Sequence, residues 1–150
     1  MSGSFLFLRY HLVWSTKDRR PLITPEWRER LYGYMGGILT NRHGRLLAIG
    51  GIADHVHLEV SLPSNVTVAD ALNALKSNSS HWIHENLPGL DHFAWQEGYA
   101  AFTVSKSAEP NLLKYIRCQE DHHLQRDFKS ELVGLLDKHG IEYDERYLWN

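Results

Sequence analysis

The segment from residue 55 to residue 62 alternates between polar and apolar side chains at every position. Successive side chains of a β-strand point to opposite faces of the sheet. The apolar face carries Val56, Leu58, Val60 and Leu62. The polar face carries His55, His57, Glu59 and Ser61. We therefore predict a strand that buries one face in an apolar core and whose other face is too polar for an ordinary core.

The other hydrophobic patterns predict the element order β-α-β-β-α-β, followed by further helices. Strands are expected over residues 5–15, 46–52, 55–62 and 96–105. Helices are expected over residues 25–43, 67–87, 108–126 and 128–139. Gly44 is expected to end the first helix in the left-handed conformation. Gly50-Gly51 predicts a bend or bulge near the end of the second strand.

This order is the split β-α-β arrangement of ferredoxin-like folds. The predicted fold class is α+β, with a ferredoxin-like antiparallel sheet and additional C-terminal helices, in a single domain over residues 1–150. The first two helices of such a fold cover one face of the sheet. We expect the third helix, or a partner chain, to cover the polar face.

Composition narrows the functional classes. With 43% hydrophobic residues the chain can bury its own core, and no run of about 18 apolar residues predicts a membrane span. The single cysteine, Cys118, fits a reducing compartment, so we expect a cytoplasmic protein. The net charge of −2 argues mildly against a protein that coats nucleic acid without specificity.

His55 and His57 point to the same side of their strand, so both rings can reach one ion. Two imidazoles rarely complete a metal site, so a third ligand is needed. The helix expected over residues 108–126 offers one, because Tyr115 and Gln119 are four residues apart and share a helix face. His122 lies on the same stripe.

These residues resemble the HUH-type single-tyrosine transposases of small bacterial insertion sequences. The resemblance covers nearly the whole chain. It rests on the blocks YHLVWSTKDRRP, DHVHLEV, WQEGYAAFTVS, YIRCQEDHH and HGIEYDERYLW, in that order. His-x-His alone would be a weak motif.

The resemblance implies a bacterial enzyme that cuts and rejoins single-stranded DNA carrying hairpins, through a 5′-phosphotyrosine. By this likeness Tyr115 is the nucleophile, and His55, His57 and Gln119 bind a divalent metal, Mg²⁺ or Mn²⁺. Members work as homodimers, in which the tyrosine helix often serves the partner's site in trans. The ligand types would also accept Zn²⁺ or Co²⁺.

Several further residues have two readings. Glu59 can orient the N–H group of a histidine or be a solvated acid. His122 can touch DNA or support Gln119, or it can be a structural or surface histidine. Candidates for holding DNA are Lys17, Arg19, Arg20, Lys76, Trp95 and Tyr99. The basic group at residues 17–20 can equally be a solvated loop, and the two aromatic residues can equally be part of the core.

Three other functions remain open on the sequence. One is a metal phosphodiesterase that uses water as the nucleophile. Another is a domesticated protein that binds hairpin DNA without transposition activity. The third is a small-molecule-binding ferredoxin-like domain, although it leaves the Tyr-x-x-x-Gln helix unexplained.

Overall fold

The computed structural model describes residues 3–119 and 127–149, and its elements follow the predicted order. The strands are β1 (Arg9–Ser15), β2 (Arg45–Ile52), β3 (His55–Ser61) and β4 (Ala100–Thr103). They form one antiparallel sheet in the spatial order β2-β3-β1-β4. The helices are α1 (Pro25–Thr40), α2 (Val68–Asn86), α3 (Glu109–Arg117) and α5 (Phe128–Lys138), and the 3-10 turn η1 (Lys17–Arg19) follows β1. The ferredoxin-like α+β prediction is confirmed.

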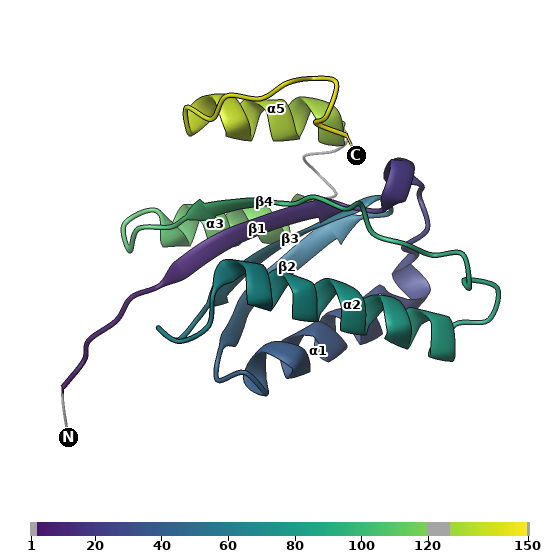
Figure 1. The fold of residues 1–150 in the computed structure, drawn as a ribbon, viewed down its shortest axis with the longest axis horizontal. Helices are drawn as coiled ribbons and strands as arrows, with labels where there is room; N and C mark the ends of the chain where they lie inside the picture. The colour runs from purple at the N-terminus through teal and green to yellow at the C-terminus, as the bar shows by residue number, and fades with distance from the viewer. Residues whose placement is uncertain (1–2, 120–126, 150) are drawn as a thin grey trace.

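The apolar face of the sheet packs against α1 and α2, which lie together on one side of it (Figure 1). Val56, Leu58 and Val60 of β3 are fully buried there. They belong to one core cluster with side chains such as Leu31 of α1 and Leu75 of α2. The alternation of β3 is thus confirmed.

The polar face is covered by helices from the C-terminal part of the chain. Helix α5 lies over this face, on the side of the sheet opposite α1 and α2 (Figure 1). Its Phe128, Leu132 and Leu136 form a second, smaller core cluster with Val13 of β1 and Phe102 of β4. Helix α3 packs against β2 and β3. The predicted third helix therefore shares the covering of this face with the helix that follows it.

The turn after α1 differs from the prediction. His43, and not Gly44, takes the left-handed conformation, with φ of 61°. Gly44 is needed for a different reason, because a Cβ atom there would lie 2.8 Å from the carbonyl oxygen of Ser61. The glycine permits close contact between two backbones instead of ending the helix.

The irregularity of β2 also lies elsewhere than predicted. The register shifts between Leu46 and Ala48, whereas Gly50 and Gly51 pair regularly with His57 and Val56 of β3. The first and fourth strands are also shorter than predicted. The exposed side chains of Phe5 and Leu6 precede β1, and β4 is limited to four residues.

The helix predicted over residues 108–126 is interrupted. Helix α3 ends at Arg117, and Cys118 has the non-helical angles φ −107° and ψ 28°. Gln119 therefore lies past a break in the helix.

Among the described helices, none combines the length and the apolar character needed to span a membrane.

Gly50 sets the distance between α3 and the sheet. A Cβ atom at this position would lie 2.1 Å from the carbonyl oxygen of Ile116, which is in the last turn of α3. Real Cβ contacts are never this short, so only glycine allows α3 to lie at its observed distance from β2. Because Tyr115 precedes Ile116, this contact also fixes the position of the tyrosine.

We expect Gly50→Ala to lower the free energy of unfolding by about 1–3 kcal/mol, since α3 must move away from β2. Urea unfolding followed by circular dichroism measures the change. The matched control is Gly37→Ala in α1, where a Cβ atom meets nothing within 4 Å. That substitution should be neutral or stabilise by about 0.5–1 kcal/mol. Equal stability of the Gly50→Ala variant and the natural chain would contradict the close contact.

Candidate metal and nucleophile site

The two histidines of β3 point into the space between the sheet and α5, and both are fully buried. The Nδ1 atom of His55 lies 2.7 Å from a carboxylate oxygen of Asp54. The Nδ1 atom of His57 lies 2.8 Å from Nε2 of His11 on the neighbouring strand β1. Because the Nδ1 atom of each ring is bonded to a neighbouring side chain, the two Nε2 atoms point to the same position.

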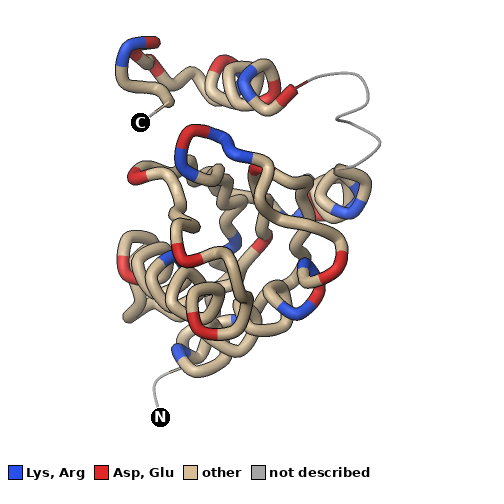
Figure 2. Tube along the Cα trace, turned by 90° about the vertical axis from the view of Figure 1, so that its right-hand side faces the viewer, with Lys and Arg blue, Asp and Glu red and all other residues tan. Residues whose placement is uncertain are grey.

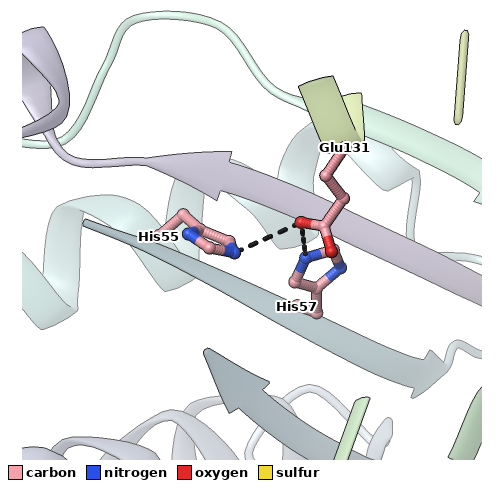
Figure 3. Close-up of side chains that lie close together, drawn as sticks. All are labelled: His55, His57 and Glu131. Atoms are coloured by element: carbon pink, nitrogen blue, oxygen red, sulfur yellow. Dashed lines mark hydrogen bonds and ion pairs between the residues drawn. The ribbon is translucent and has the colours of Figure 1, made fainter. Parts of the chain in front are cut away.

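A carboxylate from α5 meets these two nitrogen atoms (Figure 3). Oε1 of Glu131 lies 2.7 Å from Nε2 of His57 and 3.3 Å from Nε2 of His55. The ligand atoms of the three residues all lie within 4.8 Å of one another. Glu131 is itself 1% exposed, so this carboxylate is inside the protein and bonded to imidazoles instead of water.

Gln119 and Tyr115 approach the same cluster from the side of α3. The side-chain oxygen of Gln119 lies 3.3 Å from Nε2 of His55. The ring of Tyr115 packs edge-on against His57, with 5.6 Å between ring centroids. Its hydroxyl donates a hydrogen bond to Oε2 of Glu131. The four residues that the sequence singled out are thus brought together within one chain, and Glu131 joins them.

The surroundings set the protonation of the histidines. Burial, together with the neighbouring His57, lowers the pKa of His11 to about 3, so His11 is neutral at physiological pH. Burial alone would lower the pKa of His55, but the hydrogen bonds to Asp54 and Glu131 outweigh it and raise this pKa above its ordinary value. His11 can therefore act only as a neutral hydrogen-bond partner of His57.

Glu131 is not among the predicted site residues, although the sequence carries a signal for it. The apolar face of α5 is formed by Phe128, Leu132 and Leu135, at helical spacing. Glu131 is on that same face, where an acid is out of place unless it has a partner in the interior. An acidic residue on the buried face of a helix was thus the available indication.

Glu59 lies on the same face of β3 as the two histidines, but its surroundings differ from those predicted. It is fully buried, so the reading as a solvated acid is wrong. Burial, and then the neighbouring carboxylate of Glu109, raise the pKa of Glu59 to about 8, while Arg9 acts in the opposite direction. Arg9 donates to Glu109 across 3.1 Å and so joins β1 to the first turn of α3. His122 lies outside the described residues.

The basic turn after β1 lies next to the histidines. The backbone nitrogen of Thr16 donates to the carbonyl of Asp54, and the Thr16 hydroxyl donates to the carbonyl of Arg20. Lys17 and Arg20 are exposed there, and the guanidinium of Arg19 lies 5.3 Å from the ring of Trp149. Acidic and basic residues are otherwise interspersed over the side seen in Figure 2.

The other DNA-binding candidates lie in different surroundings. Trp95 belongs to the core, and its indole nitrogen donates to the hydroxyl of Ser79, so its aromatic ring serves packing. The ammonium group of Lys76 donates to the carbonyls of Glu97 and Gly98, and burial lowers its pKa. Tyr99 is 44% exposed and remains accessible.

The donor set fits a divalent cation. Two imidazole nitrogens, a carboxylate oxygen and an amide oxygen converge, and hydrogen bonds to Asp54 and His11 hold the rings in place. Such mixed nitrogen and oxygen ligands suit first-row divalent metals. The residues present can therefore hold a metal at the point that Tyr115 faces.

A model of the family described as "Transposase IS200 like" matches residues 4–119 of this chain. The match contains both histidines, Tyr115 and Gln119. This chain belongs to the IS200-like transposase family. Family membership makes it a transposase, an enzyme of DNA cleavage and strand transfer, and confirms the resemblance seen in the sequence. Helix α5 and its Glu131 lie beyond the matched segment.

Known relatives agree. The ISDra2 transposase TnpA of Deinococcus radiodurans is 28% identical over 119 residues, which are 76% of this chain and 85% of that protein. The transposase for insertion sequence element IS200 of Salmonella typhimurium is 26% identical over 132 residues, which are 85% and 84% of the two chains.

Two solved structures share the fold. A structure described as a transposase from Deinococcus radiodurans has a TM-score of 0.64 at 26% identity, and covers 79% of this chain and 96% of that one. The REP-associated tyrosine transposase bound to a REP hairpin has a TM-score of 0.61 at 16% identity, and covers 82% and 74%.

We expect Glu131→Ala to weaken the binding of Mn²⁺ to the full-length protein at least about tenfold, because one oxygen donor is lost from the cluster. Isothermal titration calorimetry measures the affinity. Glu142→Ala, which removes an exposed acid from the C-terminal segment, is the control and should bind Mn²⁺ like the natural chain. Unchanged affinity in the Glu131→Ala variant would show that the carboxylate is not a ligand.

Proposed function

We propose that this transposase cuts and rejoins single-stranded DNA by forming a covalent bond between Tyr115 and a 5′-phosphate. The observation that carries the proposal is the convergence of the Tyr115 hydroxyl with His55, His57, Gln119 and Glu131. A phenol that faces a set of metal ligands is placed to attack a phosphate held at the same point.

The step is a displacement at phosphorus. The phenolic oxygen of Tyr115 forms the new bond to phosphorus while the bond to the 3′ oxygen breaks, which leaves a 5′-phosphotyrosine and a free 3′-hydroxyl. The proton of the phenol passes to Oε2 of Glu131, which already accepts the Tyr115 hydrogen bond. The departing 3′ oxygen takes up a proton from solvent. Attack by another 3′-hydroxyl on the phosphotyrosine reverses the step and joins strands.

His55, His57, Gln119 and the Oε1 atom of Glu131 would hold the cation, for which Mg²⁺ and Mn²⁺ are the proposed choices. A bound divalent cation offsets the charge that develops on the phosphate oxygens in the transition state. Asp54 and His11 keep the imidazoles in orientation through their Nδ1 atoms. The two oxygens of Glu131 thereby connect the cation site with the nucleophile.

The proposed partner is single-stranded DNA with hairpin structure. The exposed side chains of Lys17 and Arg20 lie on the turn that is bonded to Asp54, so a strand entering the site would pass cationic groups. A related fold has been solved with a REP hairpin bound, which supports the choice of DNA. The homodimer stays a prediction, and in this chain Tyr115 already faces the histidines of its own subunit.

The proposal predicts a covalent adduct. The full-length protein is incubated with Mn²⁺ and end-labelled single-stranded DNA carrying hairpins, and the products are separated on a denaturing gel. We expect labelled protein with the natural chain and none with Tyr115→Phe. Tyr34→Phe is the matched control, because this tyrosine stacks on Trp82 on the opposite layer of the fold. It should form the adduct normally.

Two measurements separate the rival functions: this gel, and equilibrium binding of the labelled hairpin followed by fluorescence anisotropy. Cleavage without an adduct, which persists in Tyr115→Phe, would show that water is the nucleophile and the protein is a phosphodiesterase. Hairpin binding without cleavage, at equal affinity in Tyr115→Phe, would identify a domesticated binding protein. Either result ends the proposal of a tyrosine nucleophile.

A further inference from the structure

A cavity of about 490 Å³ lies between β4, α3 and α5. Phe102, Leu112 and Leu135 supply apolar wall, and Asn111, Lys138 and His139 supply polar groups. Tyr115 and His11 also line it. The volume lies in the range of cavities that hold small organic ligands. The proposed cleavage chemistry uses the hydroxyl of Tyr115 and gives the rest of this cavity no role.

Tyr115 connects the cavity with the cation site, because its side chain belongs to both. A phosphorus atom that the Tyr115 oxygen attacks must lie about 3–3.5 Å from that oxygen. A nucleoside joined directly to this phosphate then lies beside the tyrosine ring. The cavity adjoins that position, because Tyr115 is one of its lining residues.

The lining suits a nucleobase. The ring of His139 stacks on Phe102, with 4.2 Å between centroids and 26° between planes, and gives a flat surface for base stacking. The hydrogen bond between Nδ1 of His139 and the carbonyl of Leu135 fixes this ring in the wall. The amide of Asn111 offers both a donor and an acceptor to the edge of a base.

The charge of the lining suits the phosphates of a strand. None of the described residues that line the cavity is acidic, and Lys138 is exposed at its wall. The phosphate of a nucleotide therefore meets no negatively charged side chain among the described residues that line the cavity.

We infer that this cavity binds the base of the nucleotide that is joined to the cut phosphate, and so contributes to the choice of cleavage site. That the bound base belongs to the nucleotide at the cut rests on the proposed function. Binding of a free nucleotide in the cavity does not rest on it, because this binding needs neither the covalent step nor a cation.

The first test is binding without chemistry. The four deoxynucleoside monophosphates are added to the full-length protein in the absence of metal, and saturation-transfer NMR is recorded. We expect transfer to the base protons of at least one of them, with equal strength in Tyr34→Phe, which lies away from the cavity and stacks on Trp82. No transfer from the natural chain to any of the four would overturn the inference.

The variant that tests the location is Gly134→Leu. Gly134 lines the cavity from α5, and a leucine there fills space while favouring the helix. We expect it to weaken nucleotide binding at least about tenfold. Gly37→Leu, an exposed position in α1, is the control and should bind like the natural chain. Asn111→Trp narrows the same cavity from α3 and replaces Gly134→Leu if that variant does not fold. Undiminished binding in the cavity variant that folds would overturn the location.

The adduct gel separates this inference from the proposed function. Base binding that is lost in Gly134→Leu, with no adduct from the natural chain, would support the cavity and end the tyrosine mechanism. An adduct from the natural chain without base binding would do the reverse. Where both are found, sequencing the cut ends from a randomised single strand should show a base preference beside the cut that Gly134→Leu removes.

Discussion

A buried polar cluster between the sheet and the C-terminal helix is the constraint on which this structure depends. An unsatisfied buried polar group costs about 1–3 kcal/mol, and an unpaired charge costs more. Here His55 is bonded to Asp54, His57 to His11, and both to Glu131. Because these groups satisfy one another, α3 and α5 can close over a sheet face that would otherwise require water. The same bonds direct the imidazole nitrogens and the tyrosine hydroxyl to one point. The bonds that stabilise the covering helices therefore also assemble the site.

Local patterns predicted the fold well because each depends on neighbours in the sequence. The alternation in β3 follows from the period of a strand. The helix predicted over residues 67–87 begins where the Thr67 hydroxyl accepts a hydrogen bond from the backbone nitrogen of Asp70. The pair of histidines likewise needed only local geometry and the family resemblance. Strand ends were less predictable, since the apolar run at residues 5–8 continues past the paired segment.

Features that depend on distant contacts were not predictable from local patterns. Glu131 enters the site across 74 residues of sequence from His57, and only the packing of α5 brings it there. Trp95 and Lys76 look like DNA contacts in the sequence, but one fills the core and the other binds backbone carbonyls. The break at Cys118 also had no clear signal, although it separates Gln119 from the helix of Tyr115. For Trp95, tertiary packing decided between two readings that the sequence left equal. The roles of Glu131 and Lys76 and the break at Cys118 likewise follow from tertiary packing.

The contact at Gly50 has a consequence for how the reactive tyrosine is located. Helix α3 rests on β2 main chain to main chain, with no side chain between them as a spacer. The contact between the two backbones therefore sets the position of the nucleophile Tyr115 relative to the sheet. A side chain on β2 at this point would push the helix away and carry the phenol of Tyr115 with it.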